Sequence, residues 1–172
     1  MPRVHETVIN FDIFEGSNEY YGFAEATLPS VVNKLITASG AGIAGDVEVP
    51  VIGHIDPMSM TLNFRTFMPE CARLAEQRPH TLELRAAQQS RDSATGAVTV
   101  SAVKHIAIVI PKSLNPGTLR PASAADASGE YSVTYFASYI DGVKVLEVDP
   151  LNFIYNVNGT DYLSEVRTAL GK

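Results

Sequence analysis

A hairpin signal at Asp141-Gly142 constrains the fold of this chain more than any other part of the sequence. Strand-like runs of alternating residues flank it, from Thr134 to Ile140 and from Val143 to Asp149. A two-residue Asp-Gly loop favours a type I′ turn, because both central residues of that turn need a positive φ, and its length fixes the pairing register. The sequence therefore predicts an antiparallel ribbon here.

A regular register would pair Ile140 with Val143 and would sort the later residues onto two faces, because side chains alternate along a strand. The apolar face would hold Tyr135, Ala137, Tyr139, Leu146 and Val148, with Lys144 near the tip. The opposite face would hold Thr134, Phe136, Ser138, Glu147 and Asp149. We expect the first face to pack on a core and the second to be polar and acidic.

The rest of the chain also reads mainly as strands. Alternating or β-branched runs predict strands at 5–14, 19–28, 31–38, 46–52, 58–66, 81–89 and 97–110, although 31–38 could also form a short helix. Short helices are predicted at 69–77 and from Thr160 or Asp161 to Leu170, and 111–128 is expected to be a surface connection. Strand 97–110 is apolar on both faces in its second half, which favours a central or covered position. These elements predict a mainly β fold, an antiparallel sandwich or barrel with one or two short flanking α-helices.

Length, charge and cysteine content narrow the class of protein. The 172 residues are expected to form a single domain, 1–172, and they carry a net charge of −6 with no run of Lys and Arg. Tight binding to a nucleic-acid backbone is therefore not expected. No apolar stretch approaches the roughly 20 residues that span a bilayer, and the N-terminus lacks the apolar core of a signal peptide. We expect neither export nor stable membrane insertion.

Motifs for catalysis or for metal binding are not recognisable. The four histidines (His5, His54, His80 and His105) lack metal-ligand spacing, and Cys71 is the only cysteine. The loop Gly40–Gly45 has the glycine spacing of a phosphate loop, but Asp46-Val47 follows where Lys-Ser/Thr is needed. Glu147 and Asp149 are interpreted as part of a solvated sheet face rather than as an acid–base pair. We expect a non-enzymatic protein without cofactor or metal.

Several segments carry a resemblance when they are taken in order. They are Thr27–Pro29, Gly40–Gly45, Met58–Met60, Tyr135-Phe136, Tyr139–Gly142, Glu147–Asp149 and the Val-Asn-Gly-x-Asp-x-Leu ending at Val157–Leu163. In sequence and spacing they are similar to the major tail tube protein family of contractile-tailed bacteriophages and R-type phage-tail-like bacteriocins. The resemblance departs at Glu15–Glu19, an extra polar turn, and at Pro111–Ser128.

The resemblance implies a structural protein with the β-sandwich of the phage tail tube type. Family members form hexameric rings that stack into a hollow tube inside a contractile sheath, and the tube conducts DNA or ions through the target envelope. The implied partners are the chain itself, the sheath protein, the baseplate hub and the tape-measure protein, with DNA only as passing cargo. The implied location is a virion tail or tail-like particle that is assembled in the cytoplasm of the host bacterium.

Two site hypotheses and two alternatives follow. The inter-ring loop would comprise Gly40, Ala41, Gly42, Ile43, Ala44, Gly45 and Asp46, and the lumen-facing residues would be Thr134, Ser138, Glu147 and Asp149. One alternative is the tube protein of a bacterial contractile secretion system. The other is a small β-rich hydrolase or sugar-binding module, which would need clustered acids or aromatics that the sequence lacks.

Overall fold

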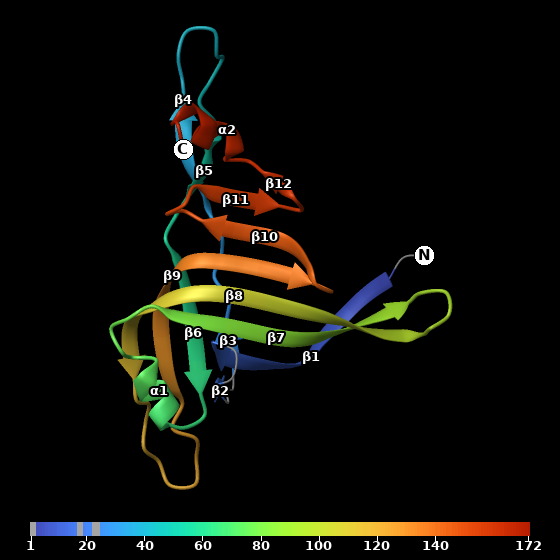
Figure 1. The fold of residues 1–172 in the computed structure, drawn as a ribbon, viewed down its shortest axis with the longest axis vertical. Coiled ribbons are helices and arrows are strands. Elements are labelled where there is room, and N and C mark those ends of the chain that lie inside the picture. The colour runs from blue at the N-terminus through green and yellow to red at the C-terminus, as the bar shows by residue number, and fades with distance from the viewer. Residues whose placement is uncertain (1–2, 17–18, 22–24) are drawn as a thin grey trace.

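The computed structural model describes residues 3–16, 19–21 and 25–172, and almost all of its regular structure is β (Figure 1). The strands are β1 (Arg3–Glu15), β2 (Glu19–Tyr21), β3 (Glu25–Thr27), β4 (Asn33–Ala38), β5 (Val47–Ile55), β6 (Met58–Phe64), β7 (His80–Asp92), β8 (Val98–Asn115), β9 (Ala127–Ile140), β10 (Val143–Asp149), β11 (Ile154–Val157) and β12 (Thr160–Asp161). The helices are α1 (Pro69–Arg73) and α2 (Ser164–Ala169). The predicted mainly β, antiparallel class is confirmed.

One ten-stranded antiparallel sheet forms most of the molecule. Its main path runs β12-β11-β10-β9-β8-β7-β1-β2, and β6 branches from it by pairing with both β9 and β3. The first half of β9 pairs with β6, where Met58 lies opposite Val133, and its second half pairs with β10. Because β6 runs across β7 and β8 at a steep angle, β9 connects two layers of a sandwich (Figure 1). The separate hairpin β4–β5 projects from this body.

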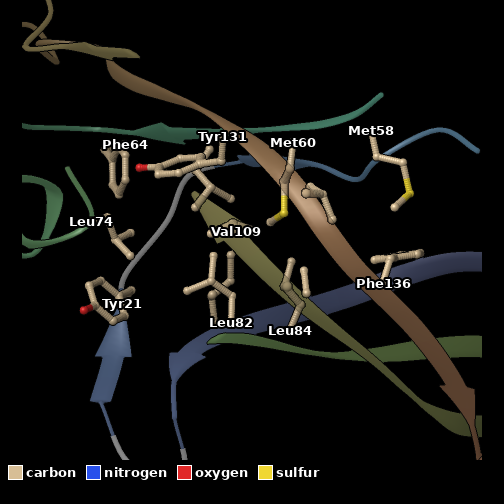
Figure 2. Packing of buried hydrophobic residues seen from close by; sticks show 14 of the residues in the cluster. Tyr21, Met58, Met60, Phe64, Leu74, Leu82, Leu84, Val109, Tyr131 and Phe136 are labelled. Carbon is tan, nitrogen blue, oxygen red and sulfur yellow. The ribbon is translucent and has the colours of Figure 1, made fainter. Parts of the chain in front are cut away.

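The core lies where these layers face each other. The alternation predicted for β6 is confirmed, since Met58, Met60, Leu62 and Phe64 are all buried. Figure 2 shows Met60 and Tyr131 facing Leu82 across Val109. Leu74, which directly follows helix α1, closes one end of the core and is fully buried like Leu82. Each such side chain contributes about 1.5–3 kcal/mol by leaving water.

Some predicted boundaries were wrong or lie outside the described residues. Strand β8 continues to Asn115 and β9 begins at Ala127, so the irregular connection is 116–126 and not 111–128. Pro111 fits within β8 although proline has no backbone N–H. The pairing of β8 with β7 ends at Val109, so Pro111 removes no hydrogen bond between these two strands. Residues 17–18 of the predicted turn and 22–24 of the predicted second strand are outside the described part; the flanking residues form β2 and β3.

The two helices are shorter than expected. Helix α1 ends at Arg73, and α2 begins only at Ser164 because Thr160–Asp161 form the short strand β12. The central position predicted for the apolar strand is confirmed, since β8 lies between β7 and β9.

The hairpin turn is confirmed, but the predicted register is not. Asp141 and Gly142 have φ values of 47° and 82°, as a type I′ turn requires. Beyond the Tyr139–Lys144 pair a β-bulge at Val145 shifts the register, so that Leu146 lies opposite Ser138 and not Ala137. A bulge adds one unpaired residue to one strand, and every later side chain of that strand therefore points to the other face.

Candidate assembly surfaces

The bulge at Val145 decides which side chains of the hairpin share a face. Phe136 lies opposite Val148, and both are buried in the core. Glu147 lies opposite Ala137, so it shares a face with Tyr135 and Tyr139 on the side of the sheet away from that core. We call this side the open face; it also includes Lys104 on β8 and Arg85 on β7, which lie opposite each other and in line with Tyr139.

The four residues predicted to line a lumen do not share one face. Glu147 lies on the open face, whereas Ser138 points to the core side, where its hydroxyl is 2.8 Å from His105 Nδ1. Asp149 is only 8% exposed and accepts backbone N–H bonds from Leu151 and Asn152 in the turn that follows β10. The prediction that they share a face is therefore wrong. The β-bulge at Val145 adds one residue to β10, so that Glu147 points to the face opposite that of Ser138.

Thr134 lies at an irregularity of β9. The partners Ile108–Tyr135 and Val109–Val133 leave it without a pairing partner on β8, and its hydroxyl donates to the carbonyl oxygen of Ile108. Its side chain is thus turned to the backbone of the neighbouring strand, which helps to bend β9 between the two layers.

A polar network occupies the open face of the hairpin. The hydroxyl of Tyr135 donates to Glu147 Oε1 at 2.8 Å, and the same oxygen lies 2.8 Å from Lys144 Nζ. Partial burial tends to raise the pKa of Glu147, but the bonds from Lys144 and Tyr135 outweigh it and leave the pKa below its ordinary value. The pKa of Tyr135 is raised, first by burial and then by the hydrogen bond to Glu147. Glu147 is therefore an ionised, paired side chain.

The open face carries both signs of charge, which corrects the prediction of an acidic face. The ammonium of Lys104 lies 5.0 Å from the centre of the Tyr139 ring, and that of Lys144 lies 5.8 Å from it. Arg85 pairs with Glu83 at 2.7 Å and also covers the ring of Phe14. A hollow of about 610 Å³ lies beside these groups; its lining includes Asp12, Arg85, Lys104 and Tyr139.

The β4–β5 hairpin, which we call the arm, forms the other distinctive surface. It extends from the body along the long axis of the molecule (Figure 1). The predicted loop Gly40–Asp46 is its tip, and every one of those residues is exposed. Leu35, Ile36 and Ile43 are 52%, 54% and 46% exposed. A single chain therefore leaves the apolar side chains of the arm in water.

The base of the arm is fitted closely to the body. Gly53 on β5 has a φ of 67°, and a Cβ there would stand 2.3 Å from Leu163 Cδ2. Leu163 is only 4% exposed, and it precedes α2. The absence of a side chain at Gly53 thus allows the arm to contact the start of α2.

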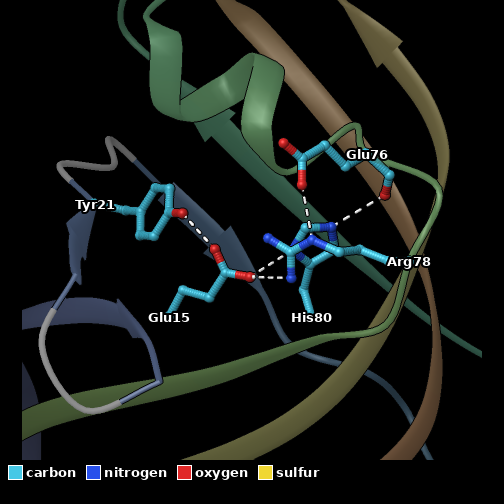
Figure 3. Close-up of polar contacts among 5 residues, drawn as sticks. All are labelled: Glu15, Tyr21, Glu76, Arg78 and His80. Carbon is cyan, nitrogen blue, oxygen red and sulfur yellow. Dashed lines mark hydrogen bonds and ion pairs between the residues drawn. The ribbon is translucent and has the colours of Figure 1, made fainter.

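A partly buried polar cluster joins β1, β2 and β7 (Figure 3). Glu15 accepts hydrogen bonds from Tyr21 and Arg78, and it lies 2.5 Å from Nδ1 of His80, whose ring is fully buried. The other ring nitrogen, Nε2, is 3.1 Å from the carbonyl oxygen of Glu76. Burial tends to raise the pKa of Glu15, but the hydrogen bonds from Tyr21 and His80 lower it below its ordinary value. This clamp fastens the edge strand β2 and the chain after α1 to β1.

Within the described ranges, no set of three or more His, Cys, Asp or Glu side chains could hold a metal ion. In the same part of the chain, no helix has the length and apolarity that a membrane crossing requires. Cys71 is buried beside Thr66, and burial raises the pKa of its thiol.

Comparison with known proteins identifies the family of this chain. The family model for phage tail tube protein FII matches residues 5–171. The tail tube protein of Escherichia phage P2 is 26% identical over 163 residues, which cover 93% of this chain and 94% of the phage protein. The sheath/tube terminator of an extracellular contractile injection system shares the fold, with a TM-score of 0.55 at 12% identity over 78% of this chain and 96% of that one. The resemblance found in the sequence is confirmed, and the chain belongs to the phage tail tube protein FII family.

Proposed function

We propose that this tail tube subunit, as a single domain of residues 1–172, forms hexameric rings that stack into the hollow inner tube of a contractile phage tail or tail-like particle. The observation that carries the proposal is the uneven covering of the molecule. One side of the main sheet packs on the core, whereas the side chains of the open face are mostly half-buried and those of the arm are exposed in the single chain. Joining the sheets of neighbouring copies into a closed barrel would also protect the short edge strands β2 and β12.

We assign the open face to the lumen of that tube. Tyr135, Tyr139, Lys104, Lys144 and Glu147 would then form its wall, and Thr134, Ser138 and Asp149 would support the wall from behind or from its end. Paired charges on such a wall leave little net attraction for a passing polyanion, so DNA or ions would move through without adhering. Glu147 is the one member of the original lumen set that keeps this role.

The arm is proposed to make the contact between rings. Gly40–Asp46 would pack on the next ring, where the exposed apolar side chains of the arm would leave water. The sheath protein would surround the tube, the tape-measure protein would set its length, and the baseplate hub would start it. This role is structural and not enzymatic, and assembly would take place in the host cytoplasm.

Electron microscopy of the purified protein at high concentration tests the proposal directly. We expect rings and tubes with a central channel. Deletion of Ala41–Ala44 should leave the body folded, as judged by circular dichroism, but should prevent long tubes. A strictly monomeric protein at all concentrations, with no tube in the particle, would contradict the proposed function.

A second experiment tests the lumen assignment. Glu147→Lys should preserve tubes but change the ion conductance of the particle or slow the passage of DNA, because it adds positive charge to the wall. Glu165→Lys, an exposed change on α2 away from the open face, is the matched control. Equal conductance in both variants would show that Glu147 does not line the lumen.

A further inference from the structure

The connection between β8 and β9 forms a firmly held loop at the end of the molecule opposite the arm (Figure 1). We call residues 116–126 the knob. The N–H of Thr118 donates to the carbonyl oxygen of Ala125 at 2.7 Å, and that of Ala125 donates to Arg65 at 2.9 Å. Gly117 has a φ of 89°, and a Cβ there would stand 2.0 Å from the Ala125 oxygen. The two sides of the loop are thus closed on each other and fastened to the end of β6.

The knob contains two residues with an unfavourable positive φ and one large apolar side chain that is exposed to water. Ala122 and Asp126 have φ values of 56° and 53°, in a region that costs a residue with a Cβ about 1–2 kcal/mol. At the outer part of the loop Leu119 is 94% exposed, the largest exposure among the described large apolar side chains. The backbone hydrogen bonds of the knob hold the base of the loop, and the hydroxyl of Ser123 donates to the carbonyl oxygen of Arg120 at 3.3 Å, so less backbone entropy would be lost on binding than from an open loop.

The neighbourhood of the knob suggests what would cover it. Arg120 follows Leu119 directly and is exposed, and Phe67 at the same end is 48% exposed. The arm at the opposite end offers exposed apolar side chains beside two exposed acids, Asp46 and Glu48. The outer parts of the two ends are complementary, because each has apolar surface and the exposed acids next to the arm tip are opposite in charge to Arg120. The other exposed charges lie further back, Asp126 where the knob joins β9 and Lys34 at the base of the arm. A contact between opposite ends of identical chains does not close on itself; it repeats along an axis.

We propose that the knob is the receiving surface for the arm of a second copy of this chain. Leu119 packs among the apolar side chains of that arm, and Arg120 pairs with its Asp46 or Glu48. The inference rests on the proposed tube function, to which it adds the second half of the ring-to-ring contact.

The test compares tube growth of Leu119 and Arg120 variants of the full chain. Leu119→Ser should raise the protein concentration needed for tube growth by about tenfold or more, because each contact loses a buried leucine. Leu119→Met, which keeps the apolar volume, should grow tubes like the wild type. Since the side chain is in water in the free subunit, all three proteins should have the same thermal unfolding midpoint at low concentration.

A charge exchange identifies the partner surface. Arg120→Glu should shorten tubes in negative-stain images, and combining it with Asp46→Lys and Glu48→Lys should restore their length. Tubes of normal length from Leu119→Ser, or no restoration by the exchange, would overturn the inference. So would loss of the rings themselves, because it would place the knob at the contact within a ring. Absence of tubes in the wild-type protein would instead contradict the proposed function.

Discussion

The sandwich body and the arm have similar shares of apolar residues but bury them very differently. In the body, β6 alternates buried and less buried residues from Met58 to Phe64. In the arm, β4 is exposed along almost its whole length, although it contains Leu35 and Ile36. The free energy of unfolding of the single chain is therefore supplied by the body. The apolar side chains of the arm can contribute only when another surface covers them.

This comparison separates stability from assembly in a way that mutations can test. A change in the body should lower the free energy of unfolding and reduce tube yield only through loss of folded protein. A change at an exposed position of the arm, away from its base at Gly53, should leave the unfolding of the monomer unchanged and should affect tubes directly. For each variant, an unfolding curve of the monomer and a curve of tube yield against protein concentration distinguish a change in stability from a change in assembly.

The largest effect is expected from the centre of the body. Leu82→Ala should lower the free energy of unfolding by about 3–4 kcal/mol, because Leu82 is fully buried and its loss leaves a cavity beneath β6. Urea unfolding followed by circular dichroism measures it. Ile36→Ala in the arm removes a similar side chain that is 54% exposed, and it should change the same quantity by less than about 0.5 kcal/mol. Equal losses in both variants would show that the arm is covered in the free subunit.

The joint between body and arm should give the next largest effect. Gly53→Ala adds the cost of a positive φ to a clash with Leu163, and it should lower the free energy of unfolding by about 3 kcal/mol. The matched control is Gly96→Ala in the β7–β8 turn. Gly96 has a φ of 70° but open space around its Cα, so only the backbone cost of about 1 kcal/mol is expected. A variant of Gly53 no worse than that of Gly96 would mean that the arm can tilt away from α2 without loss.

Most of the body could be predicted from the sequence, because strand periodicity and turn chemistry act locally. The Asp141-Gly142 turn, the alternation in β6 and the central position of β8 all follow from such local patterns. The bulge at Val145 does not, since valine favours a regular strand and nothing in its neighbours requires an extra residue. That one residue places Ser138 and Glu147 on opposite faces of the hairpin, although they were predicted to share one.

The arm tip, the clamp and the knob differ in how far the sequence predicts them. The arm tip was located correctly because a run of glycines without core residues indicates a loop. The clamp around His80 was not foreseen, since Glu15 and His80 are 65 residues apart and only the pairing of β1 with β7 brings them together. The knob gave no signal either, because Leu119 lies among prolines and small residues without periodicity.

The clamp should give a smaller, pH-dependent effect that belongs only to the body. Glu15→Gln should lower the free energy of unfolding at pH 7 by about 2 kcal/mol, because it replaces charge-assisted hydrogen bonds to His80 and Arg78. The folded-state pKa of Glu15 lies below its ordinary value of 4.5. Its contribution is therefore fully present above that value and is lost as the pH falls through the lower folded-state pKa. The difference between the wild type and Glu15→Gln should shrink in acid. Glu165→Gln, at an exposed position of α2, is the control and should unfold within about 0.5 kcal/mol of the wild type at pH 7.

The smallest expected effect on stability is in the arm, where the effect on assembly should be the clearest. Leu35→Ser removes an apolar side chain that is 52% exposed, and the monomer should unfold within about 0.5 kcal/mol of the wild type. The same variant should need a higher protein concentration to form tubes, because the apolar area that an assembled arm would bury is reduced. Leu35→Met keeps that area and should assemble normally. Sedimentation of tubes across a concentration series measures the difference, and identical curves for Ser, Met and wild type would show that this face of the arm remains in water after assembly.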